Sequence, residues 1–328
     1  MSHPTLEDVA ARAGVSRALV SLVMRGSPKV GKERREAVLK AARELGYRPN
    51  VMARGLAAGR TGIVGVLLGD LHEPVYAAIH DGLAAAAARR SVRVLLTTGG
   101  GRPARERAAV EQLLDLRPDG MVLAGPRIAA AEIERAAAGC PVAVVGRSLR
   151  SDRVDQVTGD DAAAVERAVA RLVALGHRRV ACLDAGPGSG RPARDALERA
   201  YRAAMEAAGL APAVRPPGEP AGPWHGPGAP TAVLALGDST GTAALAALYR
   251  AGLSVPGDVS LIVHGDPPGA AAAGVTTAAP PPRELGGLAM GALLDRIDAG
   301  TTAGGRRITV PPVVTERATT APPRGTRG

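Results

Sequence analysis

The stretch that most constrains this chain is residues 5–25, TLEDVAARAGVSRALVSLVMR, which has the pattern of two short helices joined by a tight turn. Apolar residues recur with the spacing of one helix face at Leu6, Val9, Ala10 and Ala13. Thr5 and Asp8 have the spacing of an N-terminal capping box, Gly14 permits a sharp turn, and Ser16 can cap a second helix. Helix, glycine turn and helix together predict a helix-turn-helix motif.

A third helix is predicted from about Lys32 to Leu45, with Gly46 ending it. Three helices that each bury one apolar stripe make a domain close to the smallest size that folds alone. Residues 1–60 hold 12 Lys and Arg against 5 Asp and Glu, so this part carries +7 of the chain's net +10. The concentrated charge is typical of a nucleic-acid-binding head, and a merely solvated basic surface is the alternative interpretation.

At this point the sequence resembles the lac repressor (LacI/GalR) family of bacterial transcription regulators. The matching segments are TLEDVAARAGVS at 5–16, VS at 20–21, AARELGYRPN at 41–50 and ARGL at 53–56. A weaker resemblance continues to about residue 320. It implies an N-terminal all-α helix-turn-helix head with a hinge helix, then an α/β body like a periplasmic binding protein, with two doubly wound parallel-sheet lobes. The implied protein is a DNA-binding regulator, most simply a repressor that binds a palindromic operator as a homodimer.

The resemblance places the second helix in the DNA major groove. The candidate DNA-binding residues of the head are Thr5, Leu6, Ser16, Arg17, Ala18, Ser21, Leu22, Arg25 and Tyr47. Because an arginine can bond O6 and N7 of guanine together, we expect Arg17 to confer a guanine preference, a phosphate contact being the alternative. Leu19 replaces a threonine usual in the family and Arg25 a common asparagine, so the preferred operator cannot be transferred from relatives.

Residues 49–61 resemble the hinge of the family, which is helical in a dimer on DNA. Asn50, Ala53 and Leu56 match its DNA-facing surface, with Leu56 as the side chain wedged into the minor groove. Such an apolar wedge unstacks a base step and kinks the duplex. A plain flexible linker remains the alternative, because Gly55 and Gly59 interrupt the segment.

From Thr61 onward, short apolar runs alternate with helical patterns, which is typical of βα units in a parallel sheet. We expect strands near 62–68, 92–97, 120–124, 141–145, 178–183, 231–236, 258–263 and 307–315. The expected helices lie near 75–90, 104–116, 129–138, 161–175, 193–208, 240–251 and 284–298. The predicted divisions are a head at 1–48, a hinge at 49–61, a first lobe at 62–158 with 286–306, a second lobe at 159–285 with 307–320, and a disordered tail at 321–328.

The composition limits the location and chemistry of the protein. At 328 residues the chain predicts two or three domains. Cys140 and Cys182 have no metal-ligand spacing, and we interpret them as buried, reduced thiols. An N-terminus without an apolar stretch and the absence of any run long enough to span a membrane predict a cytoplasmic, nucleoid-associated protein without a membrane partner.

Ligands of two-lobed folds of this kind bind between the lobes, at the C-terminal ends of strands. The candidate effector-binding residues are Asp70, Tyr76, Arg147, Asp160, Leu197, Asp238 and Asp266. Leu197 stands where the family has an effector-binding arginine, and Gly237 and Gly265 replace an asparagine and an aspartate. We therefore expect a small-molecule effector unlike a typical hexose, although a carbohydrate derivative stays open, or no effector at all.

No catalytic constellation stands out. The GGG at 99–101 lacks the Lys-Ser/Thr of a phosphate-binding loop, and His177 lies at a helix-to-strand turn where a structural role is the simpler interpretation. We expect no enzymatic activity, no cofactor and no metal. The alternatives to an effector-controlled regulator are a ligand-blind DNA-binding regulator whose body only dimerises and a small-molecule binding protein without a regulatory role.

Overall fold

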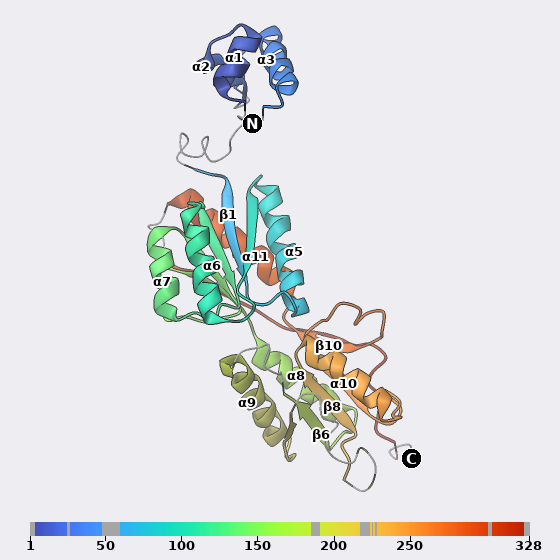
Figure 1. Ribbon diagram of the computed structural model, residues 1–328. Coiled ribbons are helices and arrows are strands. Elements are labelled where there is room, and N and C mark those ends of the chain that lie inside the picture. Colours follow the sequence, from blue (N-terminus) through green and yellow to red (C-terminus); the bar gives the residue numbers. More distant parts are fainter. Residues whose placement is uncertain are drawn as a thin grey trace. The chain divides into compact units, whose positions relative to one another are not determined.

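The computed structural model describes residues 4–24, 27–47, 60–184, 191–216, 224, 226, 228–300 and 304–324 of the chain. The chain divides into two compact units, Met1–Thr61 and Gly62–Gly328 (Figure 1). We call the first unit the head and the second the body.

The head contains three helices: α1 (Leu6–Ala13), α2 (Arg17–Met24) and α3 (Lys32–Glu44). Thr5 and Asp8 form the expected capping box, in which the Asp8 amide donates to Thr5 Oγ1 over 3.3 Å and the Thr5 amide donates to Asp8 Oδ2 over 2.8 Å. Gly14 ends α1 with φ +66°, a left-handed conformation that favours glycine. The helices meet at a small core that includes Val9, Val20 and Val38, all fully buried. The three predicted helices are therefore confirmed.

The first lobe of the body is a six-stranded sheet in the order β11-β5-β4-β3-β1-β2, with every neighbouring pair parallel. Its strands are β1 (Ile63–Leu68), β2 (Arg93–Thr98), β3 (Gly120–Ala124), β4 (Val142–Val145), β5 (Asp155–Gly159) and β11 (Arg307–Val310). Helices α5 (Pro74–Arg89) and α11 (Pro282–Ala299) pack on one face, and α6 (Pro103–Asp115) and α7 (Ala130–Gly139) on the other.

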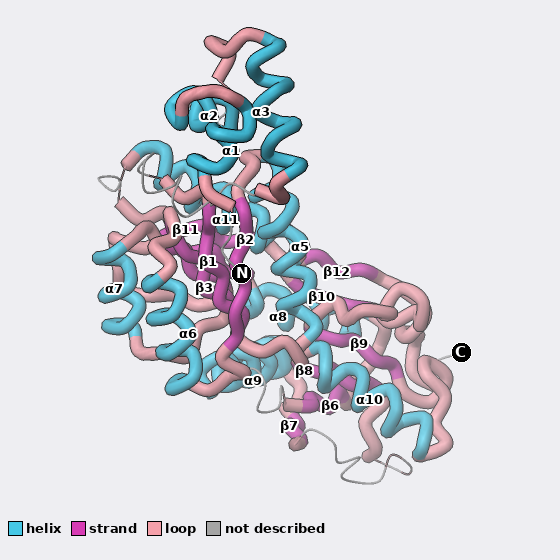
Figure 2. Tube along the Cα trace, turned by 45° about the horizontal axis from the view of Figure 1, so that its top comes forward, coloured by secondary structure: helices cyan, strands magenta, loops and turns pink. Residues whose placement is uncertain are grey.

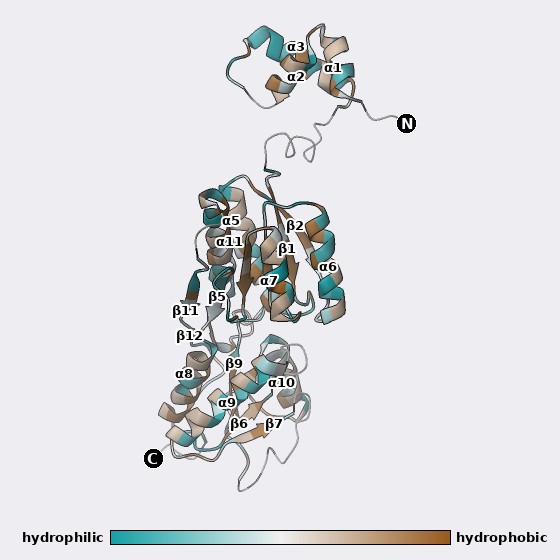
Figure 3. Cartoon of the chain, turned by 90° about the vertical axis from the view of Figure 1, so that its left-hand side faces the viewer, coloured by the Kyte–Doolittle hydropathy of each residue, from teal (hydrophilic) through white to brown (hydrophobic). Residues whose placement is uncertain are grey.

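The second lobe repeats this plan in the order β12-β10-β9-β8-β6-β7. Its strands are β6 (Val180–Leu183), β7 (Ala213–Arg215), β8 (Ala232–Leu236), β9 (Ser260–His264), β10 (Thr276–Ala279) and β12 (Val313–Thr315). Only β12 is antiparallel to its neighbour. Helices α8 (Asp161–Ala174) and α9 (Arg191–Ala207) cover one face and α10 (Asp238–Arg250) the other. Figure 2 shows the two groups of strands flanked by helices, and Figure 3 shows the apolar residues of strands such as β1 enclosed between them.

Three chain segments cross between the lobes: those joining β5 to α8, β10 to α11, and β11 to β12. The Asp160 amide donates to Val310 O over 2.9 Å, which links the first crossover to the third. A Cβ atom added at Gly159 would lie 2.3 Å from Pro280 Cγ, so the first crossover also packs against the second. The three crossovers therefore form one bundle where the two lobes meet.

Three expectations for the body need correction. A single strand over 307–315 is wrong, because Pro311 and Pro312 separate β11 from β12 and the two strands belong to different sheets. The assignment of 307–320 to the second lobe is consequently wrong for Arg307–Val310. A disordered tail from residue 321 is wrong for residues 321–324, since Ala321 O accepts from His177 Nε2 over 2.9 Å and Arg324 pairs with Asp258.

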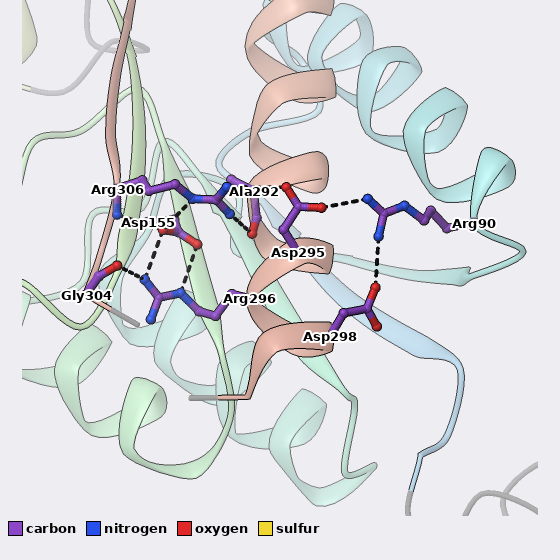
Figure 4. Close-up of polar contacts among 8 residues, drawn as sticks. All are labelled: Arg90, Asp155, Ala292, Asp295, Arg296, Asp298, Gly304 and Arg306. Atoms are coloured by element: carbon purple, nitrogen blue, oxygen red, sulfur yellow. Dashed lines mark hydrogen bonds and ion pairs between the residues drawn. The ribbon is translucent and has the colours of Figure 1, made fainter. Parts of the chain in front are cut away.

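A buried ion pair joins α11 to the start of β5. Asp155 is fully buried and accepts from Arg296 Nε over 2.9 Å and from Nη2 over 3.0 Å, while the Arg306 amide donates to it over 2.8 Å (Figure 4). Burial acts to raise the pKa of Asp155, but the Arg296 and Arg306 contacts outweigh it and hold that pKa below its usual value. The pair fixes the segment that carries the chain from α11 back to β11.

Candidate functional site

The exposed side of α2 carries the residues expected to read DNA. Ser16 caps the helix by accepting from the Leu19 amide over 3.3 Å. Arg17 and Ala18 are exposed at the first turn, whereas Ser21 is half-buried and Leu22 packs partly against the head core. The structure therefore brings Arg17 and Ala18 to a surface that a duplex can reach, and it gives Leu22 a share in packing as well.

The remaining head residues are placed less uniformly. Thr5 is exposed, Leu6 is half-buried, and Tyr47 packs against the head core next to α3. Arg25 and the hinge residues Asn50, Ala53 and Leu56 lie outside the described residues.

In the first lobe, polar side chains gather around Tyr76, near the C-terminal ends of β1 and β3. The ring lies so close to Gly69 and Gly125 that a Cβ atom at either position would be 2.6 or 2.1 Å from the hydroxyl. Burial and the nearby carboxylates Glu106, Glu73 and Asp70 raise the pKa of Tyr76 to about 12, against the opposing effect of Arg127. The phenol therefore stays protonated and able to donate a hydrogen bond.

The loop after β3 completes this side of the site. Glu106 Oε2 accepts from the amides of Arg127 and Ile128 over 2.6 and 3.1 Å. Arg147 Nη1 donates to Pro126 O and Ile128 O over 3.1 and 2.5 Å. Sequence reasoning missed Glu106, a buried carboxylate on α6, because nothing in a helical pattern separates it from a solvated glutamate. Its position under the loop makes it a positioning residue for Arg127 and Arg147.

In the second lobe, Asp238 is the central polar residue. It lies at the start of α10, directly after β8, and is only 6% exposed. Its Oδ1 atom has no hydrogen-bond partner within the described part of the chain. Burial is the main reason that the pKa of Asp238 rises to about 6. The charges of Glu73 and Asp266 add to the rise, whereas His264 and a hydrogen bond from the Asp266 backbone oppose it.

One hydrogen bond connects the two polar groups across the lobes. Ser239, next to Asp238 on α10, donates from Oγ to Oε2 of Glu73 over 3.0 Å, and Glu73 is the N-cap residue of α5. Glu73 acts electrostatically on both Tyr76 and Asp238. The predicted residues Tyr76 and Asp238 are therefore parts of one polar region between the lobes, and Glu73 and Ser239 are the members that sequence reasoning missed.

The other predicted effector residues already have partners. Asp70 accepts from the His72 amide over 3.0 Å, a bond that lowers the pKa of Asp70. Asp160 caps α8 by accepting from the Ala163 amide over 3.0 Å. Asp266 is exposed and accepts from Thr277 Oγ1 over 3.2 Å. Each of these carboxylates shapes a loop or a helix end, and any ligand would compete with that role.

The expectation that Leu197 lines the effector site needs correction. This side chain is 7% exposed and belongs to the apolar core between α9, α8 and the second sheet, so it is not a member of the polar region. One helical turn earlier, Arg194 pairs with Asp184 at the end of β6; its Nε donates to Oδ1 over 3.3 Å and its Nη2 donates to Oδ2. Arg194 lies three residues before Leu197 on the same side of α9, and this spacing could have identified it as an alternative to Leu197 in the list of candidate residues.

His177 has the structural role expected of it. Its Nδ1 lies 2.9 Å from Thr231 Oγ1 and its Nε2 lies 3.1 Å from Ser260 Oγ, so the ring ties three segments of the second lobe together. Burial lowers the pKa of His177. Across the described residues there is no group of three His, Cys, Asp or Glu arranged to hold a metal, and no helix long and apolar enough to cross a membrane.

Comparisons with known proteins agree with this architecture. Residues 5–50 match the model for bacterial regulatory proteins of the lacI family, and residues 61–217 match the periplasmic binding proteins and sugar binding domain of the LacI family. Residues 169–320 match a periplasmic binding protein-like domain. The chain is 35% identical over 321 residues to the HTH-type transcriptional regulator CelR of Thermobifida fusca, a match that covers 92% of this chain and 94% of CelR. It is 33% identical over 279 residues to the regulator AscG of Escherichia coli strain K12, covering 80% and 82%.

Solved structures give the same result. The lac repressor dimer bound to operator and the anti-inducer ONPF superposes with a TM-score of 0.81 over 98% of this chain and 100% of that chain, which at 24% identity shows the fold. A complex of CelR with cellobiose is 28% identical with a TM-score of 0.66, covering 97% and 100%. The fold and the head define a class, the DNA-binding transcriptional regulators with a ligand-binding-type body. Within that class the chain belongs to the LacI family, and these relatives are regulators, not enzymes.

Proposed function

We propose that this protein is a homodimeric repressor that binds a two-fold symmetric operator and responds to a small molecule between its lobes. The observation that carries the proposal is the exposed first turn of α2, where Arg17 and Ala18 protrude from a capped helix in a head that holds most of the chain's net charge. Residues 49–61 serve as the hinge, with Leu56 as the minor-groove wedge. Such a regulator acts on the chromosome, so its place is the cytoplasm.

An exposed edge of the first lobe supports the dimer. Strand β2 ends the sheet and has no partner on its outer side among the described strands. Leu95 and Leu96 are 38% and 39% exposed along it, and Leu71, after β1, is 55% exposed. Apolar side chains beside an unpaired strand edge mark a surface that another chain covers. We assign it to a second copy of this protein, because a single head reads only half of a symmetric site.

Effector control is proposed because the hydrogen bond between Glu73 and Ser239 links the two lobes. A ligand that binds the arrangement of the lobes with this bond better than an arrangement without it shifts the equilibrium between the two arrangements by that difference in affinity. The buried carboxylate of Asp238 and the Tyr76 phenol favour a ligand rich in hydroxyl groups. The CelR complex with cellobiose supports a carbohydrate derivative. The Leu197, Gly237 and Gly265 positions make a simple hexose a poor fit.

Selection of the full-length protein against random duplex DNA tests DNA recognition. We expect enrichment of a two-fold symmetric site that contains guanine at the position read by Arg17. Enrichment of no sequence would contradict the proposal. Calorimetric titration with cellobiose and simple hexoses, repeated with Asp238→Asn, tests effector binding; tight binding of a simple hexose would contradict the proposed ligand class.

A ligand-blind regulator is the second candidate. It is favoured by the observation that the carboxylates of Asp70, Asp160 and Asp266 already accept hydrogen bonds from within the protein. The two candidates differ in one result. If none of the tested metabolites changes the affinity for the selected operator, the ligand-blind regulator is favoured.

A further inference from the structure

We infer that Glu7 positions Arg17 for base readout and is a specificity-determining residue of the head. The inference rests on the proposed role of Arg17 and adds a partner to it. Glu7 lies in the first turn of α1, Arg17 is the first residue of α2, and Glu7 Oε1 is 3.0 Å from Arg17 Nε. The two side chains are 60% and 68% exposed, so both stand on a surface that a duplex can approach.

The local helix ends hold both side chains in place. The capping box of Thr5 and Asp8 fixes the turn that carries Glu7, and Ser16 fixes the turn that begins with Arg17. Gly14, in its left-handed conformation, turns the chain so that α2 packs on α1. The approach of Glu7 to Arg17 therefore follows from the helix-turn-helix geometry.

The electrostatics of the two helix ends favour this pairing. The N-terminus of a helix carries partial positive charge, which attracts Glu7 and disfavours the cation Arg17 at the start of α2. The first turn of α2 contains no acidic residue of its own. Glu7, reaching across from α1, supplies the missing negative charge and draws the guanidinium toward one orientation.

That orientation matters for reading a base. A guanine is recognised by two parallel N–H donors of one arginine, on O6 and N7. A carboxylate at Nε leaves the edge formed by Nη1 and Nη2 to meet the guanine, and it limits the rotation of the side chain before binding. Preorganisation of this kind lowers the entropy lost on binding the correct base. It also disfavours a swing of Arg17 toward a phosphate, which would be independent of sequence.

The test uses the full-length protein and its selected operator, with the guanine facing Arg17 either kept or replaced. Glu7→Gln keeps the length of the side chain and removes the charge, whereas Glu7→Asp keeps the charge at the helix start and withdraws it from Arg17. We expect both variants to lose about three- to fivefold of the discrimination between the two duplexes, the size expected for an exposed ion pair.

Two controls separate this result from general effects. Glu44→Gln removes another exposed ion pair of the head, that between Glu44 and Arg12, and should leave the discrimination unchanged. In an Arg17→Ala background, Glu7→Gln should no longer change the discrimination, because the partner is gone. Thermal unfolding of each variant verifies that the head is folded.

The outcomes distinguish two failures. If Arg17→Ala leaves the discrimination intact, the role of Arg17 fails and the inference fails with it. If Arg17→Ala abolishes the discrimination but Glu7→Gln only strengthens binding to every duplex, as the loss of one negative charge near phosphates would do, the inference about Glu7 alone is overturned.

Discussion

We expect the buried carboxyl of Asp238 to make the stability of the body depend on pH. Its carboxyl is buried, one oxygen lacks a partner among the described residues, and its pKa is raised to about 6 from 3.8. A raised pKa in an acid means that the folded state binds the proton more tightly than the unfolded state does. The stabilisation is therefore fully present below about pH 4 and disappears as the pH rises through about 6.

Asp238→Asn should remove this dependence. At pH 7.5 we expect the variant to be more stable than the wild type by about 2–3 kcal/mol, from the size of the pKa difference. Thermal unfolding of the body between pH 4 and 8 measures it. Asp258→Asn is the control with the opposite sign, because hydrogen bonds from Ser254 lower the pKa of Asp258 and its ionised form stabilises the fold. A lower melting temperature of Asp238→Asn at pH 7.5 would contradict the account.

Asp155 represents the other kind of buried charge, one that is paired (Figure 4). Asp155→Asn leaves the Arg296 guanidinium buried without its counter-charge, and we expect it to cost about 3–5 kcal/mol of unfolding free energy. The matched control is Asp298→Asn, which removes an exposed pair with Arg90 and should leave the melting temperature almost unchanged. Denaturant unfolding compares the two; equal effects would show that burial of the Asp155 pair carries no special weight.

The pairing of α5 with α11 depends on glycines that allow backbones to touch. A Cβ atom on Gly286 would lie 2.0 Å from Ile79 O, and one on Gly82 would lie 1.9 Å from Arg283 O. Gly286→Ala must therefore push the helices apart, at a cost of about 1–3 kcal/mol. Gly291, on the same helix, has nothing within 4 Å, so Gly291→Ala should stabilise by about 0.5–1 kcal/mol. Opposite signs in chemical denaturation are the expected result, and a harmless Gly286→Ala would refute this close packing.

The elements that the sequence predicts and those that it does not differ in what determines their conformation: local signals in the first group and pairing with distant strands in the second. The head helices carry their own start and stop signals; the Thr5 capping box and Gly14 predict where α1 begins and ends. Strands β5 and β10 were missed because they are short and partly polar, DQVTG and TTAA. Their strand conformation comes from pairing with β4, β11, β9 and β12, which no local pattern reveals.

The residues of the candidate site likewise fall into those that local sequence places and those that depend on contacts between distant segments. The positions of Asp70 and Asp238 near the C-terminal ends of β1 and β8 could be predicted, because each follows a buried apolar strand. The bond between Glu73 and Ser239 could not, since it joins residues far apart in the chain and depends on how the lobes meet. The burial of Leu197 could not be predicted either, because the resemblance fixes a position in the chain but not its surroundings; the structure places Leu197 in the apolar core.

At the scale of the whole molecule, a basic helix-turn-helix head precedes a two-lobed body whose crossovers form one bundle. In the proposed dimer the exposed leucines along β2 form the interface between two chains, so that two heads read two half-sites. A charge at this edge should separate the chains. We expect Leu96→Glu to shift the protein toward monomers in sedimentation and to weaken operator binding, while Tyr249→Glu, at an exposed side chain on α10 of the second lobe, does neither.

The most direct test of the central claim is a titration of the full-length protein against its selected operator and against the same duplex with one half-site scrambled. We expect saturation at two chains per intact duplex and an affinity at least about 100-fold lower for the half-site, because the second head loses its base contacts. One chain per duplex, with equal affinity for both DNAs, would contradict the dimeric, symmetric readout on which the proposed function depends.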